Sequence, residues 1–145
     1  MRKHLYTGAL ALALLSSAQA QDVAAGKLYV QLSNAQTMAD TCQLTFAMRN
    51  DTGMAIDKSA YNMAVVNADQ QVTTLITFEF RPLASGQTKV QQFALPGQAC
   101  EQIAGLLIND FITCETAGGP SPICETAIDQ STRTAIAFPW ELSIN

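Results

Sequence analysis

Four cysteines are the residues of this 145-residue chain that are best placed to do chemistry. They are Cys42, Cys100, Cys114 and Cys124. Thiols of this kind form disulfides, redox pairs or zinc sites, and structural zinc sites favour cysteines separated by only a few residues. No two of the four are that close, and the sequence contains no Cys-x-x-Cys motif. The spacing therefore predicts two structural disulfides and no metal site.

The one histidine, His4, lies in a segment with the layout of a secretory signal peptide. Arg2-Lys3 forms a basic start, residues 8–15 are apolar, and Ala18-Gln19-Ala20 is a small-x-small cleavage signal. We therefore expect residues 1–20 to be removed and the mature protein to be periplasmic or secreted. Such compartments oxidise thiols, which agrees with two disulfides.

Loss of His4 limits the chemistry of the mature chain. Ser-His-Asp and Cys-His catalytic sets and histidine metal sites need the missing imidazole. A glycosidase needs only two carboxylates, and Glu79 and Asp110 are the candidates inside expected strands, since the others mostly lie in turns. Glu79 lies between two phenylalanines, so strand alternation turns it to solvent. We expect no enzyme activity and no cofactor.

The composition of residues 21–145 is typical of one small acidic domain. These 125 residues carry six basic and twelve acidic side chains. Because nucleic-acid binding needs clustered lysines and arginines, the scattered basic residues argue against a nucleic-acid partner. No later apolar run approaches the ~20 residues of a membrane-spanning helix, so we expect no transmembrane anchor in the mature chain. The oligomeric state is left open.

Seven segments with alternating or apolar patterns are expected to form strands. They are residues 27–32, 42–49, 60–66, 72–80, 88–95, 103–113 and 135–144. Turn residues separate them, as in Asn50-Asp51-Thr52-Gly53. This spacing predicts an all-β fold for residues 21–145, an immunoglobulin-like two-sheet antiparallel sandwich, with a small barrel as the alternative. A single helical turn within residues 99–107 is a second alternative.

The expected topology selects one disulfide pairing. Strands two and six of such a sandwich run in the same direction, so their starts lie at the same end. Cys42 begins the second strand, and Cys100 precedes the sixth. Cys114 ends the sixth strand, and Cys124 follows across the loop that leads to the seventh. We therefore expect the pairs Cys42–Cys100 and Cys114–Cys124.

Three further residues are candidate contacts for a ligand or a partner. Asn109 and Asp110 interrupt the most apolar strand, where polar groups need partners, so they either bridge neighbouring strands or face a ligand. Trp140 shares the apolar face of the last expected strand and is either core or an anchor for a partner. Pro139 marks that strand as an edge or as bulged, and an edge can accept a partner's strand.

Several motifs stand in register with the cysteines. They are Cys42-Gln43-Leu44-Thr45-Phe46, residues 83–90, Gln92-Phe93-Ala94-Leu95 and Leu107-Ile108-Asn109-Asp110. In these motifs the chain, from Cys42 to Cys124, resembles a family of small exported alphaproteobacterial proteins often labelled "Tat pathway signal sequence domain protein". Arg2-Lys3 stands where that label expects twin arginines. The resemblance implies export and supports the fold, and it supplies no active residues.

The sequence thus predicts a non-enzymatic exported domain that serves as an interaction or accessory protein of the bacterial envelope. Its partner would be another envelope protein, bound by a strand edge or a loop surface. The alternative is a periplasmic protein that handles a small ligand or a metal through Asn109 and Asp110 or through methionine thioethers, which suit Cu(I). The irregular spacing of Met38, Met48, Met54 and Met63 favours core filling instead.

Overall fold

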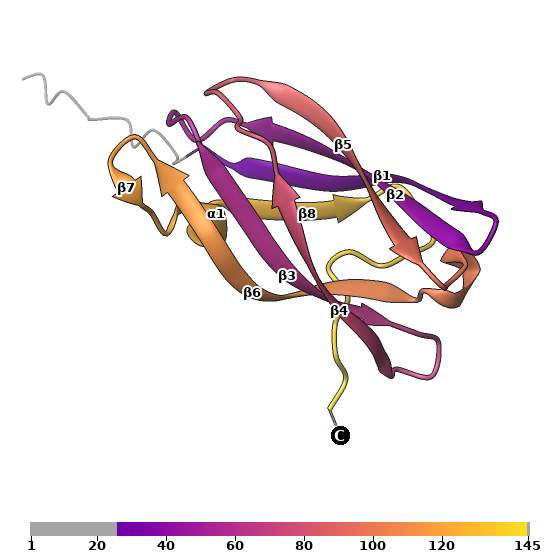
Figure 1. Ribbon diagram of the computed structural model, residues 1–145. Coiled ribbons are helices and arrows are strands. Elements are labelled where there is room, and N and C mark those ends of the chain that lie inside the picture. Colours follow the sequence, from indigo (N-terminus) through magenta and orange to yellow (C-terminus); the bar gives the residue numbers. More distant parts are fainter. Residues whose placement is uncertain (1–25, 145) are drawn as a thin grey trace, which may run out of the picture.

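Two four-stranded sheets pack face to face in the computed structural model, which describes residues 26–144 (Figure 1). The predicted signal peptide, residues 1–20, lies outside the described residues. The strands are β1 Leu28–Met38, β2 Thr41–Asn50, β3 Lys58–Val66, β4 Val72–Phe80, β5 Thr88–Pro96, β6 Gly105–Thr116, β7 Gly119–Pro120 and β8 Ile128–Thr132. Their order is β5-β2-β1-β8 in one sheet and β4-β3-β6-β7 in the other. The predicted sandwich is confirmed, and two separate sheets exclude the barrel.

Alternation along β2 shows why these segments form strands. Cys42, Leu44, Phe46 and Met48 are buried between the sheets, whereas the residues between them are more exposed on the outer face. A period of two places one side of a strand on a core and the other in solvent. Every neighbouring pair in the two sheets is antiparallel except β1 and β8, which run parallel.

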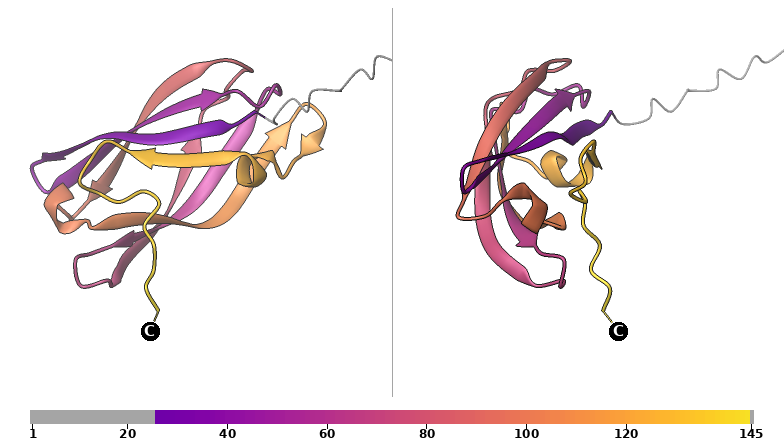
Figure 2. Two further views of the ribbon diagram at one scale, coloured as in Figure 1. Left: turned by 180° about the vertical axis from the view of Figure 1, so that it is seen from behind. Right: turned by 90° about the vertical axis from the view of Figure 1, so that its right-hand side faces the viewer.

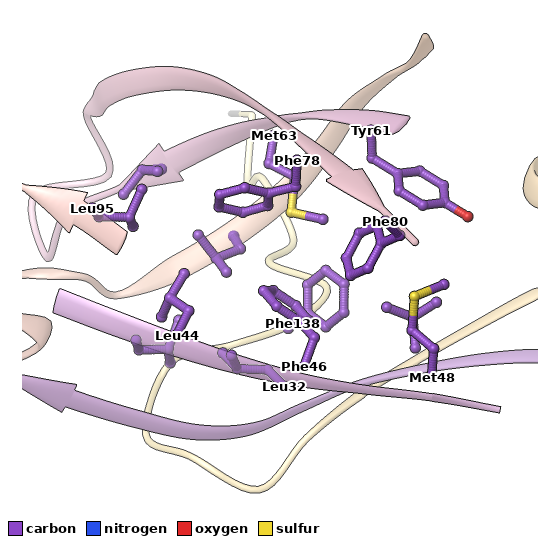
Figure 3. Close-up of a cluster of buried hydrophobic side chains, with 14 of the residues drawn as sticks. Leu32, Leu44, Phe46, Met48, Tyr61, Met63, Phe78, Phe80, Leu95 and Phe138 are labelled. Atoms are coloured by element: carbon purple, nitrogen blue, oxygen red, sulfur yellow. The ribbon is translucent and has the colours of Figure 1, made fainter. Parts of the chain in front are cut away.

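Aromatic rings from both sheets fill the centre of the core (Figure 3). The ring centroid of Phe46 lies 5.8 Å from Phe78, 5.7 Å from Phe80 and 5.6 Å from Phe138. Phe93 of β5 stacks on Phe78 with centroids 4.4 Å apart. Tilted and edge-to-face pairs at these distances add to the free energy gained by burial. Met48 and Met63 are also buried here, as core filling predicts, whereas Met38 and Met54 are exposed, so that prediction was wrong for those two.

Both predicted disulfides are present. Cys42 at the start of β2 bonds to Cys100, with their Cα atoms 4.8 Å apart, and Cys114 near the end of β6 bonds to Cys124, with Cα atoms 5.9 Å apart. Cys100 opens a 3-10 turn, η1 (Cys100–Gln102), which is the helical turn considered within residues 99–107. Cys124 lies in the short helix α1 (Ile123–Thr126).

The prediction of a last strand over residues 135–144 was wrong. The strand beside β1 is β8, Ile128–Thr132, and residues 135–144 form only an isolated bridge between Ala137 and Gly105. Ile136 and Phe138 are buried, so the apolar pattern did mark core residues, but Pro139 lies in no strand. The polar sequence of β8 lacks an apolar pattern, and it pairs with β1 because that edge would otherwise be open.

The side chain of Gln91 covers the outer edge of β4. Its Nε2 donates to the carbonyl of Glu79 at 2.8 Å, and its Oε1 accepts from the backbone N–H of Arg81 at 3.0 Å. Gln91 belongs to β5 of the other sheet, so one amide group fills the positions that an added strand would use on β4. Among residues 26–144, no helix is long and apolar enough to cross a membrane.

Candidate functional site

The fold brings all three candidate contact residues to one strand. Asn109 and Asp110 lie in β6, and Trp140 lies against its beginning. β6 is bordered by β3 along most of its length, whereas its other side, among residues 26–144, has partners only near its two ends. The outer face of β6 and its second edge together form the candidate site.

Asn109 bridges neighbouring strands. Its Nδ2 donates to Oδ1 of Asn62 in β3 at 3.1 Å, and Nδ2 of Asn62 donates to Oγ1 of Thr77 in β4 at 3.3 Å. These bonds form a polar row across three strands on the outer face, since the neighbours of Asn62 in β3 point into the core. Asp110 stands opposite Asn62 in the register and is exposed, with no side-chain hydrogen bond within the described chain.

Two β-bulges interrupt β6 at this place. Met63 pairs with Ile108 and Asn62 with Asp110, which leaves Asn109 as an extra residue. The next two pairs of the ladder likewise leave out Ile112, whose side chain is 53% exposed. A bulge twists a strand locally and re-aims its side chains. Asn109 can therefore turn toward β3, while Ile112 projects into solvent.

The C-terminal segment, residues 136–140, binds the beginning of β6. The N–H of Ala137 donates to the carbonyl of Ala104 at 2.9 Å, and the N–H of Leu106 donates back to Ala137 at 2.9 Å. Pro139 has no N–H to give, and Trp140 supplies the next donor, to the carbonyl of Leu106 at 2.8 Å. The segment thus runs parallel to β6 over one short stretch.

The two aromatic residues of the segment reach different surroundings. Phe138 is buried in the core beside Phe46, as Figure 3 shows. The indole of Trp140 lies over Gly105, in the space that a Cβ at that position would need. Leu106 points into the core, so Gly105 faces outward and Trp140 covers the outer face of β6.

The edge of β6 between these contacts is open. We call residues 107–113, on the side away from β3, the β6 edge. β7 pairs only with Glu115 and Thr116, and the C-terminal segment reaches no further than Leu106. Since the N–H and carbonyl of Leu106 face the segment, those of Ile108, two residues on, face the same side. In the described part of the chain no strand pairs with the β6 edge.

Apolar side chains lie beside the polar row on the same outer face. Ala64 of β3 stands opposite Leu75 of β4 on one side and Leu107 of β6 on the other. Ala64 is buried beneath its neighbours, Leu75 is exposed, and Leu107 and Trp140 are half-buried. Leu75, Leu107 and Trp140 therefore supply the apolar surface next to the β6 edge. We call Leu75, Ala64, Leu107 and Trp140 the apolar row.

The carboxylates of the outer face form no buried acid–base pair. Glu79 is exposed, as strand alternation predicts. Glu115 pairs with Lys58 at the surface, with Nζ and Oε2 3.7 Å apart. Over residues 26–144, no group of three or more His, Cys, Asp or Glu side chains is placed to hold a metal ion.

Sequence reasoning missed two buried polar atoms, Oη of Tyr61 and Oε1 of Gln130. Neither has a hydrogen-bond partner among the described residues. Tyr61 packs between Phe80 and Phe111, with ring centroids 5.7 and 5.5 Å away. Burial raises the pKa of its hydroxyl well above the ordinary value, because the phenolate would lose its hydration. Alternation marks Tyr61 as core but says nothing about a partner for its hydroxyl.

The comparisons with known proteins bear on the fold alone. The chain is similar to the solved structure of IrmA from Escherichia coli, with a TM-score of 0.55 and 11% sequence identity over 81% of this chain and 98% of that one. No family model and no curated protein matches the sequence. At this identity the likeness shows a shared β fold and transfers no function.

Proposed function

We propose that this protein is a non-enzymatic, exported β-sandwich domain that binds another protein of the bacterial envelope. The partner would add a strand to the β6 edge. The observation that carries this proposal is the open stretch of β6 between the C-terminal segment and β7. Exposed N–H and carbonyl groups on such a stretch are a template for strand addition.

The surroundings of the β6 edge support a protein partner. The apolar row lies beside it, and Ile112 projects from the edge itself. Centres of protein interfaces are depleted in charge and contain aromatic residues such as tryptophan. By contrast, the side chain of Gln91 bonds to the outer edge of β4, so in this sheet the β4 edge is capped and the β6 edge is open.

Export and lack of catalysis are part of the same proposal. Two disulfides agree with an oxidising compartment, as does the signal-peptide layout of residues 1–20. A chain without His4 has few means of general base catalysis, and the carboxylates of the outer face are exposed.

Site-specific photo-crosslinking in the native envelope tests the proposal. A photoreactive residue at Ile112 should give a protein adduct, and one at Tyr29 should not. Tyr29 is the control because it is also exposed, 41% against 53%, but lies in β1, which is paired with β2 on one side and β8 on the other. A lysine elsewhere on the β6 edge should weaken the adduct, because a charge there opposes strand addition. Ile108 packs against the core and is not suitable for this change, so Thr113→Lys is the variant to test. Equal adducts from both positions, or none from Ile112, would contradict the proposal.

A further inference from the structure

The last residues of the described chain have the pattern of a strand but no sheet. We call residues 141–144 the tail. Trp140, Leu142 and Ile144 are apolar, and the residues between them, Glu141 and Ser143, are polar. This period of two is the pattern of a half-buried strand. Leu142 is nevertheless 52% exposed and Ile144 83% exposed.

The tail leaves the sandwich where the open part of β6 begins. In Figures 1 and 2 it runs away from both sheets after the C-terminal segment has passed the start of β6. The last hydrogen bond between them joins the N–H of Trp140 to the carbonyl of Leu106. Directly beyond that bond lie the free N–H and carbonyl of Ile108.

A continued parallel ladder would join these groups. In a parallel pair, a residue donates to one residue of its neighbour and accepts from the residue two further along. The N–H of Leu106 already donates to the carbonyl of Ala137, and the carbonyl of Leu106 accepts from the N–H of Trp140. A regular ladder would use the N–H of residue 139, but Pro139 has none, so the spacing is one residue longer. The next step would have the N–H of Ile108 donate to the carbonyl of Trp140, and the N–H of Leu142 donate to Ile108.

The side chains of the tail fit this register. Leu142 would lie on the same face as Trp140, two residues earlier, opposite Asn109 and diagonal to Leu107 of the apolar row. The exposed apolar surface of Leu142 would then be covered. The bulge at Asn109 limits the ladder to this one further step, because the spacing of β6 changes there.

We propose that the tail closes onto the β6 edge of its own molecule and competes with a partner strand for it. The closure itself rests on the contacts above, and the competition rests on the proposed function. The closed tail would hold only two further hydrogen bonds, so a partner strand of matching pattern could displace it. The tail thus regulates access to the β6 edge.

Two proline variants give a matched test of closure. Leu142→Pro removes the N–H that would bond to Ile108, whereas Ser143→Pro removes one that points away from β6. The Leu142 bond holds the closed tail in place, so its loss should also free the bond from the N–H of Ile108 to the carbonyl of Trp140. Amide exchange at Ile108 in the chain from residue 21 onward, followed by NMR, should therefore speed up roughly three- to tenfold in Leu142→Pro, as expected for one net hydrogen bond. Ser143→Pro should leave the exchange rate unchanged.

A chain that ends at Trp140 provides a second measurement. It keeps the indole over Gly105 and lacks the tail. Its C-terminus is amidated so that Trp140 gains no carboxylate, and Ile108 should then exchange as in Leu142→Pro. Equal exchange at Ile108 in all four proteins would overturn the closure. Protection that rises with protein concentration would also overturn it, because the tail of a second molecule would then occupy the edge.

The outcomes for the tail and for the proposed function are distinct. If closure fails while Ile112 still forms its position-specific adduct, only the tail proposal is lost. If the tail protects Ile108 and Ile112 gives no adduct, only the proposed function is lost. If both hold, the chain that ends at Trp140 should give a stronger Ile112 adduct than the chain with the tail.

Discussion

The indole of Trp140 occupies the space that a side chain on Gly105 would fill. This contact joins a residue near the end of the described chain to the first residue of β6, and it depends on the absence of a Cβ. Covering an outward-facing glycine in this way fixes the C-terminal segment on the sheet beside the three backbone bonds of Ala137 and Trp140.

Gly105→Ala should therefore destabilise the protein by about 1–3 kcal/mol, the usual cost of forcing extra atoms into a packed site. In a Trp140→Ala background the same change should cost much less, because its obstacle is gone. Chemical unfolding followed by circular dichroism measures both. Gly118→Ala is the control, since a Cβ there meets nothing within 4 Å. Equal costs in the two backgrounds would contradict the packing role of Trp140.

Replacing the side-chain amide of Asn50 should lower the free energy of unfolding. It is fully buried; its Nδ2 donates to the carbonyls of Met54 and Leu83, and its Oδ1 accepts from Thr52. Asn50→Asp keeps the shape, loses both donors and buries a charge, so we expect a loss of about 2–4 kcal/mol in unfolding free energy.

Asn67→Asp is the matched control for that variant. Oδ1 of Asn67 accepts from the backbone N–H of Asp69 and of Gln71, both at 3.0 Å, which a carboxylate also does. The one donor bond that Asn67→Asp loses, from Nδ2 to Oε1 of Gln71 at 3.3 Å, is exposed to solvent, so its loss costs little. Urea unfolding should show little change for Asn67→Asp. A loss as large as that of Asn50→Asp would mean that the donors of Asn50 are unimportant.

Tyr61→Phe should stabilise the protein by about 1 kcal/mol, because it removes a buried hydroxyl that has no hydrogen-bond partner within residues 26–144. Tyr29→Phe is the control, since Tyr29 is partly exposed. Thermal unfolding at neutral pH compares the two variants. A loss of stability in Tyr61→Phe would show that the hydroxyl has a bonded partner in solution.

The same hydroxyl predicts sensitivity to alkali. The folded-state pKa of Tyr61 lies above the ordinary value of 10.0, so above that pH the folded protein holds a proton that the unfolded chain releases. This contribution to stability is complete below pH 10.0 and falls as the pH rises beyond it. Unfolding free energy against pH should therefore decline more steeply in the unchanged protein than in Tyr61→Phe. Parallel curves for the two proteins would contradict this role of the Tyr61 hydroxyl.

The two disulfides should differ in their contribution. Cys42–Cys100 closes a separation of 58 residues and Cys114–Cys124 one of 10. From loop entropy, removing the first pair should cost ~4 kcal/mol and removing the second ~2.7 kcal/mol. Paired alanine variants measured by urea unfolding provide the comparison. A larger loss from the shorter loop would mean that local packing around α1, and not chain entropy, sets the order.

Gln91→Ala should expose the outer edge of β4 and promote self-association, because the carbonyl of Glu79 and the N–H of Arg81 lose their side-chain partner. Gln92→Ala is the neighbouring control, whose amide bonds only to Gln43 and Thr45 on the outer face. Light scattering at increasing concentration should rise for Gln91→Ala alone. A monomeric Gln91→Ala would show that this amide does not protect the edge.

The sequence was sufficient for the fold class and for the disulfides, because both follow from local pattern. The alternation of β2 predicts its buried face, and strand direction places Cys42 near Cys100. The polar strand β8 could not be found, since it is held by pairing with β1 and has no apolar pattern of its own. Residues 135–144 had the pattern but not the pairing, and Pro139 contributes to that outcome.

Sequence patterns indicate single residues of the candidate site, but not how these residues come together. The pattern marks Asn109 as a polar residue in an apolar strand and Trp140 as core or an anchor, but their partners, Asn62 and Gly105, are distant in sequence. The open β6 edge depends on where β7 and the C-terminal segment stop, which no local pattern encodes. The cap formed by Gln91 likewise depends on how the two sheets stack.

The parallel pairing of β1 with β8 also has a mechanical consequence. Leu28 lies opposite Ile128 and Leu32 opposite Thr132, so the start of β1 and the end of β8 are at opposite ends of the ladder. Tension applied through these two ends slides the strands along each other, and all the rungs of the ladder bear the load together. An antiparallel pair would be peeled open one rung at a time. The short polar β8 therefore makes this pair of strands resist a pull between Leu28 and Thr132.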